Sequence, residues 1–195
     1  MIQYNGMKAE ENKNESYGQL PAGPYVGGVQ NEKIDGVSPD QWLVLRLDVI
    51  EGEYTGYFTK RYQHDSQMGG MYPAKYKGDY KIRIPNPNSS SQYPESDIRR
   101  FNDMIYRIES SNPGFHWDGD ETKLKGKVVG FSMQDDEYNG NQFTRIARLE
   151  TANDVRNGIV KVMKPRKRQD QQTTATMPLD AQTNFPIVET SELPF

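Results

Sequence analysis

Two stretches of the chain, residues 57–62 and 72–83, interleave aromatic and cationic side chains. This combination suits single-stranded nucleic acid, because flat rings stack on bases while Lys and Arg contact phosphates. Each stacked base would contribute about 1–3 kcal/mol whatever its identity, so such a site tolerates different sequences. We predict that single-stranded DNA is contacted by Tyr57, Phe58, Lys60, Arg61, Tyr62, Lys75, Tyr76, Lys77, Tyr80, Lys81 and Arg83.

A purely structural interpretation of the same residues is that the aromatic side chains pack in the core and the cations are solvated at the surface. Tyr and Phe are ordinary strand formers, and a small β-domain uses them in its core. Lys and Arg on an edge strand also prevent aggregation. Side chains alternate between the two faces of a strand, so only one face of residues 57–62 can line a groove. Which face does so stays open at the level of sequence.

Two acidic clusters, residues 118–121 and 135–137, are the candidates for metal or catalytic chemistry. Carboxylates can hold Mg²⁺ or Ca²⁺, and residues 121–123 match the E-x-K element of metal-dependent nucleases. Both clusters lie beside glycines at predicted turns, where Asp and Glu are common. The sequence contains no phosphate-binding loop and no nucleophile elbow. We predict no catalytic residue, metal or cofactor; a nuclease whose first cluster meets another carboxylate in a concave site is an alternative.

The end of the sequence, Glu192-Leu193-Pro194-Phe195, has the composition of a docking peptide. Leu193 and Phe195 suit a small apolar pocket on a partner, and Glu192 with the terminal carboxylate suits Lys or Arg around it. Capture of a C-terminal carboxylate is a known mode of peptide recognition. We predict that these four residues bind a partner protein.

Composition indicates a cytoplasmic protein that makes no membrane contact. Among 195 residues there is no cysteine, which excludes disulfides and cysteine-based metal sites, and there are only two histidines. No apolar run reaches the roughly 18 residues of a transmembrane helix, and no secretory signal is visible at the start. Hydrophobic residues make up 34% of the chain, so part of it is expected to be polar tail or loop.

Charge is unevenly distributed along the chain. The formal net charge of −3 counts mildly against nucleic-acid binding. Residues 55–100, however, carry eight cations and four anions, a formal charge of +4, whereas residues 180–195 carry three acids and no cation. A basic middle and an acidic end are expected where a tail stays off, or competes for, a basic surface.

Hydrophobic periodicity predicts a chain rich in strands with one helix. The predicted strands cover residues 20–29, 42–50, 54–62, 80–84, 125–133, 142–149 and 159–163. Leu43, Leu45, Leu47 and Val49 share one face of the second strand. An Asn-Gly pair at 139–140 signals a hairpin.

The helix is predicted from Ile98, Phe101, Ile105 and Ile108, which share one helical face. Ser96 or Asp97 would cap its start, and residues 112–114 would end it.

These elements predict a mainly β fold, a small OB-like Greek-key barrel with one α-helix after the third or fourth strand. OB-folds often bind oligonucleotides; a β-sandwich with an inserted helix is the structural alternative. The predicted organisation is a flexible N-terminal arm at 1–18, the OB-like domain at 19–164, and a disordered tail with the docking tip at 165–195.

Two resemblances bear on function. Residues 20–23, 51–54, 110–118 and 124–130 resemble segments of uncharacterised proteins of bacteriophages and integrated elements of gut Firmicutes. Some of those proteins are considered single-strand-binding or recombination accessory proteins, and the likeness runs from about residue 20 to 149.

The tip is similar to that of bacterial single-stranded DNA-binding proteins, which end in acidic residues followed by Pro-Phe. In that family the tip recruits replication, repair and recombination enzymes, a role that the resemblance implies for Glu192 to Phe195. This chain has Thr190 and Ser191 where the family usually has Asp.

Taken together, the sequence predicts a non-enzymatic, sequence-tolerant single-stranded DNA-binding protein of phage or mobile-element replication and recombination. Its tip would recruit replication or recombination proteins. The main alternative is a β-domain adaptor or phage structural protein that never touches DNA, whose basic strand residues would be scattered over different faces. DNA versus RNA, and the oligomeric state, stay open.

Overall fold

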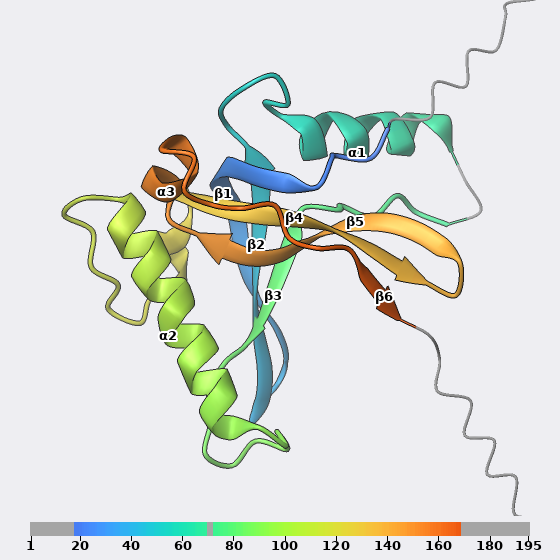
Figure 1. Cartoon of the computed structure of the whole chain (residues 1–195). Coiled ribbons are helices and arrows are strands. Elements are labelled where there is room, and N and C mark those ends of the chain that lie inside the picture. The colour runs from blue at the N-terminus through green and yellow to red at the C-terminus, as the bar shows by residue number, and fades with distance from the viewer. Residues whose placement is uncertain (1–17, 70–71, 169–195) are drawn as a thin grey trace, which may run out of the picture.

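An open, mixed sheet of six strands runs through residues 18–69 and 72–168, the part of the chain that the computed structural model describes (Figure 1). Three α-helices and a short 3-10 helix accompany it within those residues. The elements in chain order are β1 (Gly23–Val37), β2 (Asp40–Val49), α1 (Tyr57–Met68), β3 (Asp79–Arg83), α2 (Pro94–Ser111), η1 (Glu121–Leu124), β4 (Val128–Tyr138), β5 (Asn141–Glu150), α3 (Ala152–Arg156) and β6 (Arg166–Arg168).

The long strand β1 joins the two halves of the sheet. The strand order is β3-β2-β1-β4-β5, and all neighbours on this path are antiparallel. The first part of β1, from Gly23 to Gly28, pairs with β4, whereas its distal part pairs with β2. β6 pairs with the end of β4 in parallel orientation.

The predicted OB-like barrel is wrong: the fold is mixed α/β and the sheet is not closed. β3 and β5 are the two edges of the main path and do not pair with each other. β3 has only five residues, and the space between the edges is a hollow lined by side chains of α1 and of the segment before β1. In that segment the Gln19 amide donates to the Gln142 carbonyl of β5 over 3.1 Å.

Helix α1 replaces the hairpin strand predicted over residues 54–62. The prediction weighed the aromatic residue types, which favour strands, but Tyr57 and Phe58 are buried at the start of a helix instead. Gly56 leads into the helix with a φ of 74°, a conformation that glycine adopts without steric cost. The buried carboxylate of Asp48 accepts the Phe58 amide over 2.9 Å, so a distant strand supplies the cap that the local sequence lacks.

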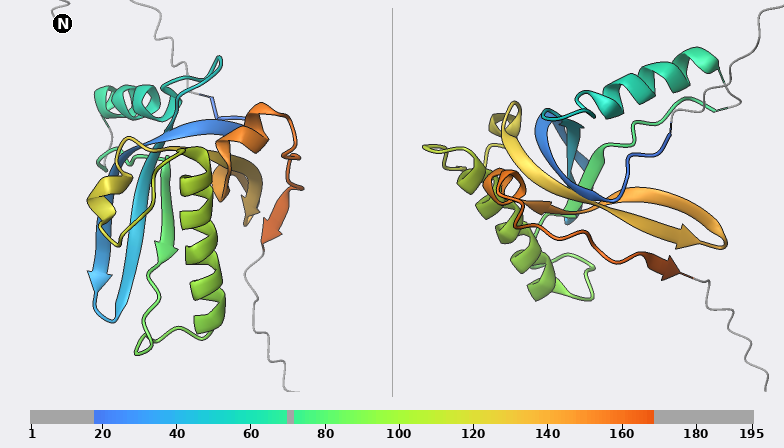
Figure 2. Two further views of the ribbon diagram at one scale, coloured as in Figure 1. Left: turned by 90° about the vertical axis from the view of Figure 1, so that its left-hand side faces the viewer. Right: turned by 45° about the horizontal axis from the view of Figure 1, so that its top comes forward.

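The predicted helix is confirmed as α2, with different caps. Phe101, Met104 and Ile108 are buried, and α2 packs against β3 and β4 (Figure 2). The helix begins at Pro94 without a side-chain cap, and Asp97 instead accepts a hydrogen bond from Ser91. One member of the predicted face, Ile98, is exposed.

The remaining strands divide into confirmed and wrong predictions. β2, β3, β4 and β5 lie where the periodicity placed them, and Asn139 and Gly140 both have positive φ in the turn between β4 and β5. The strand predicted over 159–163 is wrong, because these residues have no regular secondary structure. Neither α3 nor β6 was predicted. β6 lies within residues 165–195, which were predicted as the tail.

None of the helices within the described residues is long and apolar enough to cross a membrane.

Candidate nucleic-acid interface

A groove of about 490 Å³ lies between the two edge strands, and we call it the edge groove. Its walls are β3 with the residue Lys77 before it, β5 from Phe143 to Ala147, and the first turns of α1. Arg100 of α2 and the segment at Gln19 and Leu20 complete it. The groove therefore lies where a closed barrel would have paired its edges.

Cations outnumber acids in the lining of the edge groove. One acid, Asp79, lines it, together with five cations: Arg61, Lys77, Lys81, Arg100 and Arg145. Arg46 neutralises Asp79 from outside the groove, with Nε and Oδ1 3.0 Å apart. The groove is therefore positively charged, although the whole chain has a formal charge of −3.

The five cations differ in their availability to a ligand. Lys81 is ion-paired with Asp35 at 2.9 Å, and Arg145 with Asp136 at 2.6 Å. Arg61 lies near Asp65 and donates to the Tyr57 hydroxyl.

Lys77 and Arg100, by contrast, have no ion pair with any residue that the structure describes. Both are exposed, so they are the cations best placed to meet a phosphate.

Four aromatic rings line the groove and serve two purposes. Tyr57 is 6% exposed and Phe58 is 2% exposed, so both are packing residues. Tyr80 and Phe143 are half-buried on opposite walls and leave part of each ring accessible. Burial raises the pKa of the Tyr80 hydroxyl above its ordinary value.

The structure brings six of the eleven predicted DNA-contacting residues to one groove: Tyr57, Phe58, Arg61, Lys77, Tyr80 and Lys81. Because α1 is a helix, Tyr57, Phe58 and Arg61 share a face that an extended strand would have divided. The three lie at positions i, i+1 and i+4 of the helix.

The other five predicted residues do not line the edge groove. Lys60 donates to the Thr55 carbonyl over 2.8 Å, and Lys75 is exposed on the loop between α1 and β3. Tyr62 and Tyr76 pack against each other, with ring centroids 5.9 Å apart.

Arg83, the fifth, pairs with Asp40 at 2.6 Å. Its guanidinium also lies 5.0 Å from the centre of the Trp42 ring, so an acid and an aromatic side chain already engage it.

Among the cationic and aromatic residues that line the groove, the sequence prediction missed three: Arg100, Phe143 and Arg145. Phe143 and Arg145 are two residues apart and share one face of the confirmed strand β5. This strand therefore has the same combination of aromatic and cationic residues that pointed to residues 57–62 and 72–83. Arg100 lies on the predicted helix, seven residues before Arg107, and hence about two turns away on the same side.

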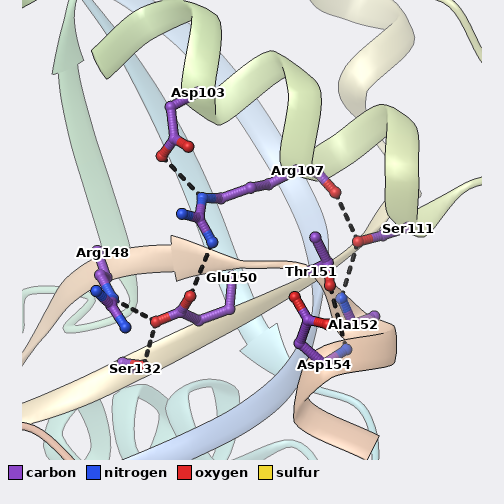
Figure 3. Close-up of polar contacts among 9 residues, drawn as sticks. All are labelled: Asp103, Arg107, Ser111, Ser132, Arg148, Glu150, Thr151, Ala152 and Asp154. Carbon is purple, nitrogen blue, oxygen red and sulfur yellow. Dashed lines mark hydrogen bonds and ion pairs between the residues drawn. The ribbon is translucent and has the colours of Figure 1, made fainter. Parts of the chain in front are cut away.

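A polar network fixes α2, and with it Arg100, against the sheet. Glu150 of β5 is buried, and its carboxylate accepts from Arg107 of α2 and from Ser132 of β4, each over 2.8 Å (Figure 3). Arg148 pairs with the same carboxylate. The Ser111 hydroxyl, near the end of α2, accepts the Ala152 amide over 2.9 Å. These contacts hold one wall of the edge groove in place.

The acidic clusters serve local structure. Asp118 pairs with Lys123, and Asp120 caps η1 by accepting the Thr122 amide over 3.0 Å. Hydrogen bonding and charge from Lys123 hold the pKa of Asp118 below its usual value. Among residues 18–69 and 72–168, no group of three carboxylate or histidine side chains is arranged to hold a metal ion. The convergence that the nuclease alternative requires is not seen in that part of the chain.

The predicted partner-binding residues Glu192, Leu193, Pro194 and Phe195 lie outside the described residues, as does the predicted arm up to residue 17. No protein-family model matches the chain, and no curated protein matches it. The case for a function therefore rests on the edge groove.

Proposed function

We propose that the protein binds single-stranded DNA in the edge groove with little sequence preference. The observation that carries this proposal is the lining of a single groove of about 490 Å³ by five cations, one neutralised acid and two accessible rings. Cations that track phosphates, next to rings that stack on bases, are the two components of single-strand binding sites.

Within the groove, the proposed roles follow from exposure and ion pairing. Lys77 and Arg100 contact phosphates, because neither has an ion pair among the described residues. Tyr80 and Phe143 stack on bases from opposite walls. Stacking requires bases that are free of a duplex, so the groove favours a single strand over a double helix.

Fluorescence anisotropy with a labelled oligo-dT at two salt concentrations tests the proposal. Affinity is expected to fall with salt, with a log–log slope of about −0.7 for each phosphate neutralised. Lys77→Ala and Arg100→Ala should each weaken binding and make the slope shallower by about 0.7.

Lys60→Ala is the matched control for these variants, because Lys60 is a neighbouring cation that does not line the groove. Absence of binding at low salt, or an equal loss in the control, would refute the proposal.

One observation favours a second candidate, the adaptor that does not bind DNA. Five of the eleven predicted residues lie off the groove, which is the scatter that this alternative predicted. An adaptor would bind no oligonucleotide at low salt, so the same titration separates the two.

The proposed setting in phage or mobile-element replication and recombination is supported by the sequence resemblances alone, and the proposed cytoplasmic location by composition. Recruitment of replication or recombination proteins through Glu192 to Phe195 is supported by the resemblance of the tip and by its composition, which is that of a docking peptide.

A further inference from the structure

A second groove of about 410 Å³ adjoins the edge groove. Gln19 and Phe143 line both grooves, so the two hollows meet at these side chains. The other side of the second groove is lined by Pro165, Arg166 and Lys167, at the start of β6. Figure 1 shows β6 beside the β4–β5 hairpin. We call this hollow the β6 groove.

The position of β6 follows from where β1 begins. β1 starts at Gly23, opposite Met133, so β1 leaves the remainder of that edge of β4 unpaired. β6 pairs with this vacant edge, with Lys167 opposite Glu137. Gln134 also donates to the Lys164 carbonyl over 2.8 Å. The backbone of this basic segment is thereby held next to the groove.

The side chains of the segment point largely into solvent. Lys164, Arg166 and Lys167 are exposed, and Lys167 keeps 78% of its side-chain surface accessible. Lys167 lies 3.6 Å from Glu137, and this is the only ion pair of the three cations within the described residues. Arg166 and Lys167 therefore line the β6 groove with exposed side chains, and the exposed Lys164 precedes them on the same segment.

Three acids line the same groove and must be weighed against these cations. Asp136 is buried and paired with Arg145, and Glu137 faces Lys167. Asp135 is exposed. Two of the three acids are thus neutralised by partners within the fold, and Lys164 and Arg166 stay available for an anion.

We propose that a single strand leaving the edge groove passes over Phe143 and places its phosphates against Lys164, Arg166 and Lys167. This inference rests on the proposed function and extends it, because it makes β6 a second phosphate-binding element of a longer site. The ligand is the same nucleic-acid strand in both grooves, and the Phe143 ring lies between the two grooves.

Two oligonucleotide lengths test the inference, oligo-dT of about 4 and about 16 nucleotides, which span the usual range of site sizes for single-strand binding folds. The variant combines Lys164→Ala, Arg166→Ala and Lys167→Ala. It should bind the longer oligonucleotide with a salt slope shallower by up to about 2, at roughly 0.7 per phosphate contact. Its affinity for the shorter oligonucleotide should equal that of the wild type.

A matched triple variant controls for net charge: Lys33→Ala, Lys60→Ala and Lys125→Ala. These three cations are exposed and line neither groove. Melting temperatures establish that both triple variants are folded. Unchanged binding of the longer oligonucleotide by the β6 variant, or an equal loss in the control, would overturn the inference. Binding of neither oligonucleotide by the wild type would instead remove the proposed function, and the two failures are distinguishable.

Discussion

Asp48 is the residue that most directly ties a strand to the edge groove. It lies near the end of β2 and is 3% exposed. Its carboxylate accepts three backbone amides, from Val49 and Phe58 over 2.9 Å each and from Thr59 over 3.1 Å. Because Gly56 offers no side chain to cap α1, Asp48 satisfies amides at the start of that helix that would otherwise lack partners.

Asp48→Ala is therefore expected to destabilise the fold by about 3 kcal/mol, because buried amides lose a charged acceptor. Urea unfolding measures the change. Asp135→Ala removes an exposed acid and should change the free energy of unfolding by less than about 0.5 kcal/mol. Equal effects of the two substitutions would show that Asp48 does not anchor α1.

Tyr76 gives a second prediction at the residue scale, through its ionisation. Its hydroxyl donates to the Leu47 carbonyl over 3.0 Å, and burial raises the pKa of Tyr76 to about 12. In the unfolded chain a Tyr has a pKa of about 10. Between these values the unfolded chain releases the proton while the folded one retains it, so stability should fall as pH rises from 10 towards 12.

Phenolate absorbance during an alkaline titration checks this behaviour of Tyr76. Tyr25, whose pKa burial also raises to about 12, should contribute a second late step. Tyr76→Phe should remove one late-titrating group and leave the other tyrosines with a raised pKa, which are Tyr25, Tyr54 and Tyr80. An unchanged titration would mean that Tyr76 is not the buried phenol that the structure places beneath α1.

At the scale of elements, β3 and β5 each contribute one accessible ring, Tyr80 and Phe143, to opposite walls of the edge groove. Tyr80→Ala and Phe143→Ala should each weaken oligo-dT binding by about 1–3 kcal/mol, the contribution of one stacked base. Tyr80→Phe keeps the ring and should bind nearly as well as the wild type.

Tyr62→Ala is the control for stacking, since Tyr62 is partly exposed but lies off the groove. If all of these rings could be removed without loss, the groove would bind by charge alone, and its preference for a single strand would have to arise elsewhere.

The elements also show what sequence periodicity can predict. β2 was predictable because its buried residues Leu43, Leu45 and Leu47 repeat with the period of a strand. α2 was predictable because its buried residues Phe101, Met104 and Ile108 repeat with the period of a helix. α1 was not, because after Phe58 its side chains are no longer fully buried and no apolar stripe marks it. Its helical start depends on Asp48, a contact across ten residues that the local sequence does not reveal.

The candidate site was predictable in part for the same reason. Tyr80 belongs to a correctly predicted strand and Lys77 to the loop before it, and both line the edge groove. Arg100 and Phe143 were missed because tertiary packing, rather than proximity in sequence, brings α2 and β5 to the same hollow. The number of strands did not predict that the sheet is open, because a sheet closes into a barrel only if its edge strands, here β3 and β5, pair with each other.

At the scale of the whole molecule, charge is segregated between the part of the chain that the structure describes and residues 169–195. The edge groove and the β6 groove gather cations from α1, α2, β3, β5 and β6. Residues 169–195 contain four acids, Asp170, Asp180, Glu189 and Glu192, and no Lys or Arg. A segment with a net negative charge attached to a basic surface competes with other anions for it, and salt screens that competition.

Truncation after Arg168 removes those four acids and changes the formal net charge from −3 to +1. The truncated protein is expected to bind oligo-dT more tightly than the full chain at low salt. The difference should shrink as salt rises, because the Debye length falls from about 30 Å at 0.01 M to about 8 Å at 0.15 M.

Deletion of Leu193 to Phe195 alone removes no acidic side chain and should leave oligo-dT affinity nearly unchanged while abolishing capture of a partner. Weaker DNA binding by the truncated protein would show that the acidic segment supports the interface instead of competing with the strand for it.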